Sequence, residues 1–243
     1  MRIFKCIFYV LPLFISCFAL GQTADTTKPV APTREKTGHQ LTFSIDASQP
    51  IINAFISYRQ GYEFAADYYL HKELYAVVEG GFGNATVNYT GPVNLQYNSN
   101  NSFIRGGINR CILTRQSVDD WDAVFIGARL GVGFINRTAA QYNVVDSIWG
   151  NTPKGITPAQ NFTGYWFELT GGMRMELVKH FFVGYLVRGK FLLNTSAFQD
   201  LAPIYVAGYG RADKNAVFDF NFYLTYAIRW KRHNLNPVKV KVP

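Results

Sequence analysis

The segment from Val217 to Trp230, VFDFNFYLTYAIRW, alternates apolar and polar residues along most of its length. Its apolar residues occupy every second position and are mostly aromatic: Phe218, Phe220, Phe222, Leu224, Tyr226, Ile228 and Trp230. The positions between them hold Asp219, Asn221, Tyr223, Thr225, Ala227 and Arg229. A period of two predicts a β-strand with one apolar and one polar face. The segment is also much longer than the average strand of about 5–6 residues.

The same period of two recurs along the chain from His39 onward. We expect seven further strands, over Leu41–Ile45, Tyr62–Leu70, Leu74–Phe82, Ile104–Ile108, Ala123–Phe134, Phe167–Leu177 and Phe181–Phe191. The links between the strands alternate in length. The shorter links are expected at His71-Lys72, Thr114–Asp120 and Lys179-His180, and the longer ones at Ser48–Gln60, Thr90–Ser99, Asn143–Gln160 and Asn194–Asn215. Alternation of short turns and long loops, with an even number of strands, is typical of outer-membrane barrels.

These features predict an all-β fold, an eight-stranded antiparallel transmembrane β-barrel with short periplasmic turns and longer external loops. The alternative is a soluble lipocalin-like barrel, whose apolar residues would face inward and whose outer face would be rich in Lys and Glu. Here the apolar face carries many Phe, Tyr and Trp residues, and the opposite face carries charges of both signs but few lysines. This distribution favours lipid outside the barrel and polar residues inside it.

The composition excludes two other classes of protein. The 243 residues are 48% hydrophobic and only 16% charged, and their mean hydropathy is -0.02. A disordered chain would combine low hydrophobicity with high net charge. A helical protein with several membrane spans would show several uncharged runs of about 20 apolar residues. This sequence has one such run, at its N-terminus.

Residues 1–21 are typical of a secretory signal peptide. Arg2 and Lys5 precede an apolar stretch, and Ala19-Leu20-Gly21 forms a small-residue cleavage site. An uncleaved anchor and lipidation at Cys17 are the alternatives. We expect a signal peptide (1–21), a periplasmic linker (22–38), an outer-membrane β-barrel (39–230) and a basic C-terminal tail (231–243). The expected location is the outer membrane of a Gram-negative cell, after cleavage of the signal peptide.

The polar face of the strands carries charges of both signs in nearly equal numbers. The inward acids are expected to be Asp46, Glu63, Asp67, Glu79, Glu168, Glu176 and Asp219. The inward bases are expected to be Arg105, Arg129, Arg174, Arg188, Lys190 and Arg229. An isolated buried charge is costly, and pairing relieves that cost. The sequence therefore predicts a structural network of paired charges that fills the lumen, with a narrow polar channel or ligand site as the alternative.

No residue pattern predicts catalysis, a metal site or a cofactor. His39, His71, His180 and His233 fall in the linker, the periplasmic turns or the tail, so none is expected beside an external nucleophile. Metal sites of His and Cys need clustered ligands, and Cys111 is the one cysteine left after cleavage of the signal peptide. The protein is therefore expected not to be an enzyme. No nucleic-acid partner is expected, because an exported chain meets no genome and no nucleic-acid motif is present.

Aromatic residues near the strand ends are expected to form girdles at the two membrane interfaces. The periplasmic girdle would contain Tyr68, Trp121, Phe181 and Trp230, and the external one Tyr89, Tyr142, Tyr165 and Trp166. In the external loops, Trp149 is a candidate anchor for a partner, or packs over the barrel mouth. The apolar segment 49–60 is expected to form a short helix or cap in or over the mouth.

Four short runs resemble a known family. They are Ala47-Ser48-Gln49-Pro50-Ile51, Gly61-Tyr62-Glu63, Gly127-Ala128-Arg129-Leu130-Gly131, and Trp166-Phe167-Glu168 with Gly171-Gly172. Together they resemble the small uncharacterised outer-membrane β-barrel proteins of Bacteroidota, classed as a domain of unknown function, over about residues 39–232. The resemblance implies an eight-stranded porin-like or OmpX-like barrel with no established catalytic residues. Many such barrels end at an aromatic residue, whereas here Lys231–Pro243 follows Trp230, so the assembly signal would be internal.

The expected function is a structural or surface-interaction role through the external loops. A narrow channel for small solutes is the second hypothesis, and an outer-membrane enzyme is the third. The expected partners are outer-membrane lipid, the outer-membrane assembly machinery during biogenesis and an unidentified extracellular ligand.

Overall fold

The computed structural model describes residues 38–56, 58–113, 121–144, 154–198 and 201–231. The expected signal peptide, with Cys17, lies outside the described residues, as do Trp149, His233, the linker up to residue 37 and the tail from residue 232. Among the described residues, no helix has the length and apolar character needed to cross a membrane.

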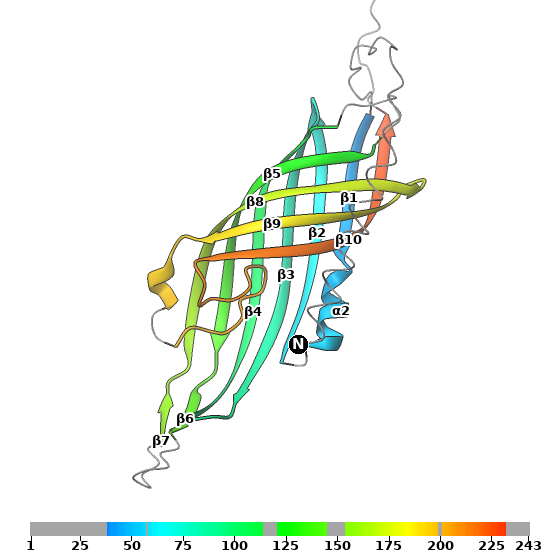
Figure 1. The fold of residues 1–243 in the computed structure, drawn as a ribbon. Helices are drawn as coiled ribbons and strands as arrows, with labels where there is room; N and C mark the ends of the chain where they lie inside the picture. Colours follow the sequence, from blue (N-terminus) through cyan, green and yellow to red (C-terminus); the bar gives the residue numbers. More distant parts are fainter. Residues whose placement is uncertain (1–37, 57, 114–120, 145–153, 199–200, 232–243) are drawn as a thin grey trace, which may run out of the picture. The chain divides into compact units, whose positions relative to one another are not determined.

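Eight long strands hydrogen-bond to one another in a closed ring (Figure 1). Around the ring they follow the order β1 (Gly38–Asp46), β2 (Arg59–His71), β3 (Leu74–Tyr89), β4 (Val93–Cys111), β5 (Ala123–Arg137), β8 (Gln160–Val178), β9 (Phe181–Leu192) and β10 (Ala216–Lys231). Strand β10 then pairs with β1 and closes the ring, and neighbouring strands are antiparallel throughout. Every strand of the ring pairs with two neighbours, although β1 is short and reaches only Phe64–Tyr68 of β2 and Tyr223–Lys231 of β10.

The connections divide the ring into two ends, which we call the turn end and the loop end. The turn end carries the links after β2, β4 and β8, and the links at Lys72-Glu73 and Lys179-His180 are two-residue hairpins. The loop end carries the longer links after β1, β5 and β9. The all-β fold with eight antiparallel strands, short turns and longer loops is therefore confirmed. The chain enters the ring at Gly38 and leaves it at Lys231, both at the turn end.

The expected long link at Thr90–Ser99 is wrong. Strand β3 continues to Tyr89 and β4 begins at Val93, so the two strands are joined by a short turn. The period of two persists here, with Tyr97 buried and Gln96 and Asn98 exposed. The outward-facing residues of this part of β4 are amides rather than apolar residues, so apolar alternation does not indicate that the strand continues here. Strand β6 (Ala140–Val144) extends this region by pairing with the start of β4, and β7 (Lys154–Thr157) pairs with β6.

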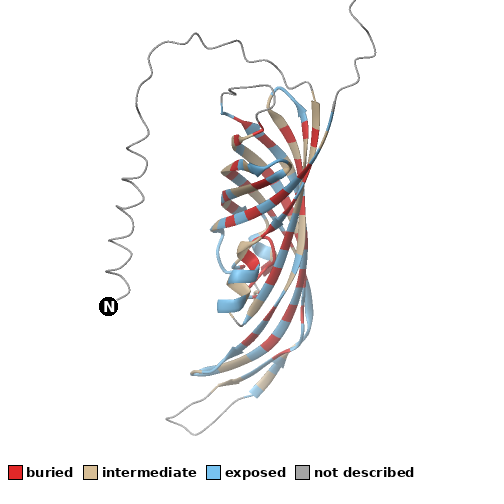
Figure 2. Cartoon of the chain, turned by 90° about the vertical axis from the view of Figure 1, so that its right-hand side faces the viewer, coloured by how far each residue is buried: buried red, intermediate tan, exposed pale blue. Residues whose placement is uncertain are grey.

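The two faces of the strands match the sequence pattern (Figure 2). Apolar residues such as Phe43, Ile104 and Leu130 point out of the ring and are 49–63% exposed. Polar residues such as Thr42, Arg105 and Asn221 point inward and are buried. A ring of this size has an interior that side chains can fill. The interior of this protein therefore contains many buried polar and charged side chains beside its apolar ones, and its large outer surface is apolar.

The apolar segment after β1 forms the expected short helix, α2 (Ser48–Phe55). The Asn53 side chain fixes the helix beside the loop end of β2, because its amide donates to the Gly61 carbonyl and accepts from the Gly61 N–H, both at 3.0 Å. The N-terminus of α2 is held by Asp46, whose Oδ1 accepts a hydrogen bond from the Ser48 N–H at 2.8 Å. Ile51 and Phe55 remain exposed.

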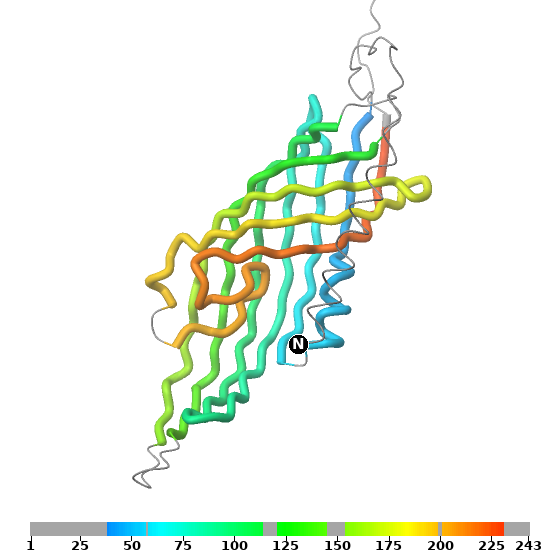
Figure 3. Tube along the Cα trace, in the orientation of Figure 1, coloured from blue at the N-terminus to red at the C-terminus, as the bar shows by residue number. Residues whose placement is uncertain are grey.

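The link after β9 turns back into the ring (Figure 3). It contains the short 3-10 helix η2 (Thr195–Phe198) and then residues Leu201–Asn215, which we call the plug loop. Tyr205, Val206 and Tyr209 of the plug loop are buried, in one apolar cluster with Phe103 and Trp166 of the ring. The loop end of the interior is therefore filled by the protein's own chain.

Candidate functional site

The most strongly coupled polar site is a cluster of six charged side chains inside the ring, which we call the buried charge network. Each member comes from a different strand, and the six are Glu63, Glu79, Arg105, Arg129, Glu168 and Arg188. The strand register sets several of them opposite one another: Glu79 faces Arg105, and Arg129 faces Glu168. All six side chains are 95% or more buried. Local alternation turns each side chain inward, and pairing of the strands then brings opposite charges together.

Arg105 is the centre of the network. Its Nη2 lies 2.5 Å from Glu63 Oε2 and its Nε 2.5 Å from Glu79 Oε2. Its Nη1 lies 3.2 Å from Glu168 Oε1 and also donates to the Gly208 carbonyl of the plug loop at 3.0 Å. One guanidinium group therefore contacts three carboxylates and the plug loop.

Arg188 forms a second bridge between two of the same carboxylates. Its Nη1 lies 2.8 Å from Glu79 Oε2 and 3.1 Å from Glu168 Oε2. Its Nε donates to Asn221 Oδ1 at 2.8 Å, and its Nη2 donates to the Tyr223 hydroxyl. Fixed dipoles and opposite charges thus surround a guanidinium that has no exposed surface.

Arg129 and Trp166 complete the network. Arg129 forms an ion pair with Glu79 Oε1, and Trp166 Nε1 donates to Glu168 Oε1 at 2.7 Å. The network therefore holds three carboxylates and three guanidinium groups, so its formal charges cancel. Removing one partner of a buried ion pair leaves an uncompensated charge and costs about 3–5 kcal/mol.

Among the residues that the structure describes, three further ion pairs lie inside the ring, outside the network. Lys190 Nζ lies 2.7 Å from Asp219 Oδ2 and also donates to the Gly208 carbonyl at 2.7 Å. Arg174 Nη1 lies 2.9 Å from Asp67 Oδ1. Arg229 Nη2 lies 2.8 Å from Glu176 Oε2 near the turn end.

Asp46 is the remaining inward acid predicted from the sequence, and hydrogen bonds hold it. Its Oδ2 accepts from Asn221 Nδ2 at 2.6 Å, and its Oδ1 accepts from the Ser48 hydroxyl at 2.5 Å as well as from the Ser48 N–H. The structure therefore places all the predicted lumen residues inside the ring. It brings Glu63, Glu79, Glu168 and their arginines into one cluster and leaves Asp67, Glu176 and Asp219 in separate pairs.

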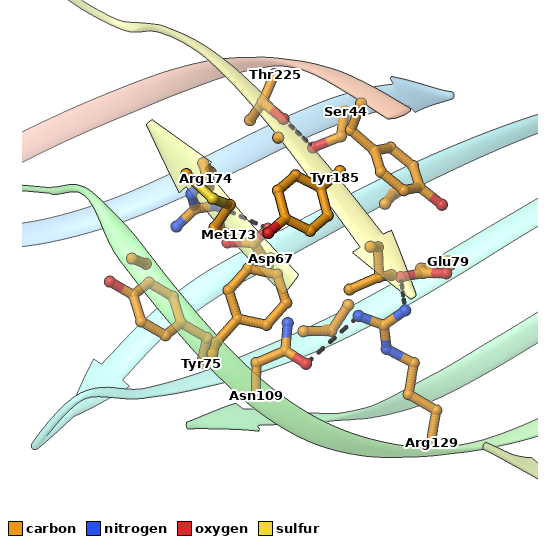
Figure 4. Close-up of a pocket in the computed structure, with 17 residues that line it drawn as sticks. Ser44, Asp67, Tyr75, Glu79, Asn109, Arg129, Met173, Arg174, Tyr185 and Thr225 are labelled. Carbon is orange, nitrogen blue, oxygen red and sulfur yellow. Dashed lines mark hydrogen bonds and ion pairs between the residues drawn. The ribbon is translucent and has the colours of Figure 1, made fainter. Parts of the chain in front are cut away.

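A cavity of about 50 Å³ separates the Arg129–Glu79 pair from the Arg174–Asp67 pair (Figure 4). Ser44 and Thr225 line it and hydrogen-bond to each other at 2.7 Å. A buried water needs a cavity of at least about 10–15 Å³, whereas small-molecule pockets are about 300–1,000 Å³. The cavity therefore has room for a few water molecules but not for a typical organic solute.

The plug loop is a part of the site that the sequence analysis did not identify. The Gly208 carbonyl accepts from both Arg105 and Lys190, and Gly208 has a φ of +78°. A Cβ at this position would lie 2.5 Å from the Phe103 ring, so a side chain would be both strained and obstructed. The available signal was the pair of glycines Gly208 and Gly210, both of which adopt positive φ. On the sequence alone these glycines are equally consistent with an exposed loop.

The prediction that Trp121 and Trp166 belong to the aromatic girdles is wrong. Trp166 is fully buried inside the ring, and Trp121 is 94% buried at the turn end against Tyr69. Neighbouring residues of a strand point to opposite faces. Since Tyr165 points outward, Trp166 has to point inward. The outward aromatic residues Tyr89, Phe181 and Trp230 are exposed as expected.

The described histidines lie near the turn end. His39 lies between Tyr68 and Trp230, with ring centroids 5.9 Å from each, and His180 Nδ1 contacts the Ala227 carbonyl at 3.0 Å. Within the described ranges, no three His, Cys, Asp or Glu side chains are grouped so that they could hold a metal ion. Cys111 is buried and free.

Several solved structures of membrane barrels align with most of the chain. Ail, the attachment invasion locus protein of Yersinia pestis, is 8% identical, with a TM-score of 0.36 over 79% of this chain and 97% of that one. CarO of Acinetobacter baumannii is 10% identical, with a TM-score of 0.36 over 80% and 98%. The N-terminal β-barrel domain of OprF of Pseudomonas aeruginosa is 10% identical, with a TM-score of 0.28 over 81% and 100%.

A search of curated proteins found no match to the sequence. A family model described as a domain of unknown function, DUF6048, matches residues 2–233. The resemblance to a family of unknown function is therefore confirmed, while the assignment to Bacteroidota stays a prediction. Because the model spans almost the whole sequence, the chain belongs to the DUF6048 family.

Proposed function

We propose that this protein is an outer-membrane β-barrel with a closed interior, which acts through its external surfaces rather than as a solute channel or an enzyme. The turn end faces the periplasm, and the loop end faces the cell exterior. Outer-membrane lipid surrounds the barrel, and the outer-membrane assembly machinery inserts it after removal of the signal peptide.

The outer surface of the ring supports the membrane location. Large apolar side chains are exposed on every strand of the ring, for example Phe43, Phe64, Phe82 and Phe220. Monomeric soluble proteins rarely expose contiguous apolar patches larger than a few hundred Å². In a bilayer the same side chains contact hydrocarbon, and the pairing of each strand with two neighbours satisfies most backbone hydrogen-bonding groups of the ring without water.

The burial of the interior charges is the observation that carries the closed-barrel proposal. Glu168 and Arg188 have no exposed surface, and Arg105 and Lys190 are 1% exposed. In a water-filled channel such side chains would line the lumen and be hydrated. Their burial supports a lumen filled by ion pairs at its middle and by the plug loop at its external end.

The narrow channel remains the second hypothesis, and it requires the plug loop to leave the barrel. That movement would break the hydrogen bonds from Arg105 and Lys190 to Gly208 and would expose the buried aromatic side chains of Tyr205 and Tyr209. The third hypothesis, an external enzyme, gains no support from the described histidines, because they lie near the turn end.

The external loops are the proposed interaction surface. They include α2, the β6–β7 hairpin and the segment that contains Trp149, which remains a candidate anchor for an extracellular ligand. This assignment follows from the closed interior, since the periplasmic turns are short and the barrel wall faces lipid.

Outer-membrane fractionation with a heat-modifiability gel tests the location. The full chain is expected in the outer-membrane fraction, and its gel mobility should change on boiling because a folded barrel resists the detergent. A soluble protein with no mobility shift would refute the membrane barrel and favour the lipocalin-like alternative.

Planar-bilayer recording tests the closed interior. The reconstituted chain is expected to give no steady conductance, whereas a variant that lacks Leu201–Asn215 should conduct more. Steady conductance of the intact chain would refute the closed interior and favour the channel.

A further inference from the structure

Five amide side chains form an in-register row on the outer face of the barrel, which we call the amide row. It runs from Gln60 through Asn84, Asn100 and Asn136 to Asn161, and each residue is the direct register partner of the next. The five residues belong to β2, β3, β4, β5 and β8 and are all exposed. Neighbouring strands lie about 4.8 Å apart, so the row spans about 19 Å.

The amide row borders exposed aromatic residues on three of its five strands, β2, β3 and β5, and the polar residues Ser102 and Thr163 on β4 and β8. The next outward positions toward the turn end hold Tyr62, Phe82 and Phe134 on three of the strands, and all three are exposed. On the other side of the row, the outward positions of β4 hold Asn98 and Gln96, which are also exposed. On β2, β3 and β5 the row therefore lies directly beyond the exposed aromatic residues, whereas on β4 the polar outer face begins one outward position earlier, at Ser102.

A shallow groove of about 460 Å³ lies over one half of the amide row. Asn100, Asn136 and Asn161 line it together with Phe134, which belongs to the exposed apolar surface. The groove thus combines a row of amides with one aromatic ring. Such a volume is large enough for a small organic group, unlike the cavity inside the barrel.

The chemistry of this face favours a neutral polyhydroxylated ligand. Each amide offers two N–H donors and a carbonyl acceptor, and a sugar hydroxyl can both donate and accept. The segments 84–89 and 93–102 contain no charged residue. Recognition of phosphate or carboxylate groups relies on Arg or Lys, which this face of β3 and β4 does not provide.

We propose that the amide row docks the sugar headgroup of a glycolipid in the outer leaflet of the membrane. This inference rests on the proposed membrane location, because the molecule next to the apolar surface is then a lipid whose headgroup lies at the row. Sugar hydroxyls would hydrogen-bond to Asn100 and Asn136, while the apolar face of a sugar ring would pack on Phe134. A second copy of this chain, docked amide to amide, is the competing occupant.

The test measures how much glycolipid stays bound to the full chain after detergent extraction. The probe is an uncharged glycolipid, monoglucosyldiacylglycerol, and the comparison lipid is phosphatidylethanolamine, which has no sugar. The double variant N100L/N136L removes the central amides while keeping an outward side chain of similar size. Losing two hydrogen bonds of about 0.5–1.5 kcal/mol each is expected to lower glycolipid retention by about tenfold.

Two controls separate the headgroup effect from other causes. Asn88→Leu changes an exposed amide farther along the outer face of β3 and is expected to leave retention unchanged. Retention of phosphatidylethanolamine is expected not to fall in any variant, because the leucine substitutions remove no apolar residue from the outer surface. If the leucine pair fails to show the heat-dependent gel shift, N100A/N136A takes its place.

Three results would overturn the inference. One is equal glycolipid retention by the wild type and the folded double variant. Another is an equal loss of both lipids, which would indicate a general change in lipid contact. The third is a loss of dimers, seen by cross-linking, with unchanged glycolipid retention, which would assign the row to a second copy. Failure of the proposed function is read separately, because the wild type itself would then lack the gel shift.

Discussion

Replacing Arg105 by Met should be among the most destabilising single changes in the barrel interior. The substitution removes the guanidinium that contacts Glu63, Glu79 and Glu168 and also releases the Gly208 carbonyl of the plug loop. Met is of similar length and apolar, so the change removes charge more than volume. The neutral network of three acids and three bases would then carry an excess of one negative charge.

The structure indicates which carboxylate loses most. Glu79 keeps its contacts with Arg129 and Arg188, and Glu168 keeps Arg188 and Trp166. Glu63 keeps the Tyr223 hydroxyl at 3.3 Å and Arg188 at 4.0 Å, neither of which matches the lost contact at 2.5 Å. Leaving one buried charge uncompensated costs about 3–5 kcal/mol. We therefore expect R105M to lower the free energy of unfolding by that amount.

The double variant R105M/E63Q separates loss of charge balance from loss of packing. Neutralising Glu63 removes the uncompensated charge, so the double variant should be more stable than R105M. The coupling free energy between the two substitutions should be about 2 kcal/mol, within the range for residues in contact. The exposed pair of Arg211 and Asp213 provides the matched control. Arg211→Met is expected to leave the urea midpoint unchanged, because exposed ion pairs contribute little to stability.

Urea unfolding of the chain refolded in detergent micelles measures these differences. Tryptophan fluorescence, to which Trp166 buried beside Glu168 contributes, reports the interior, and the gel shift on boiling reports the whole barrel. A loss below about 1 kcal/mol in R105M would show that water or rearrangement replaces Arg105, since a buried hydrogen-bonded charge costs more than that to leave unpaired. Additive effects of R105M and E63Q would also refute the proposed coupling.

Two further predictions concern the packing of the interior and the plug loop. Gly131→Ala should lower the free energy of unfolding by about 1–3 kcal/mol, because the new Cβ would lie 2.3 Å from the Trp166 ring. Gly106→Ala should fold normally, because the nearest atom to its new Cβ is the Val77 carbonyl oxygen at 3.8 Å. Equal urea midpoints for the two variants would contradict this packing. Burial raises the pKa of the Tyr209 phenol to about 12, above its ordinary value of about 10, so its contribution to holding the plug loop is complete below pH 10 and is lost as the pH rises through about 12. Limited proteolysis between Leu201 and Asn215 should therefore increase over that range in the wild type, and Tyr209→Phe, which cannot ionise, should remove this part of the increase.

The period of two determined the fold class and the direction of the side chains. Alternation is a local property, since successive Cβ atoms of a strand point to opposite faces whatever the strand pairs with. It was therefore enough to assign Asp46, Glu79 and Arg188 to the interior and Phe220 to the outer face. The prediction of a loop at Thr90–Ser99 was wrong, because amides replace apolar residues on the outer face there. The prediction of Trp166 in an outer girdle was also wrong, because strict alternation from the outward Tyr165 requires an inward side chain at position 166.

Only the tertiary structure decided which charges meet and what fills the barrel. Register sets Glu79 opposite Arg105, but the contact of Arg105 with Gly208 joins residues 103 positions apart in the sequence. The amide row likewise exists only once five strands align, because its members are spread from Gln60 to Asn161. The local sequence pattern determines whether each side chain points into or out of the barrel. Which distant residue that side chain contacts depends on the register and closure of the whole ring.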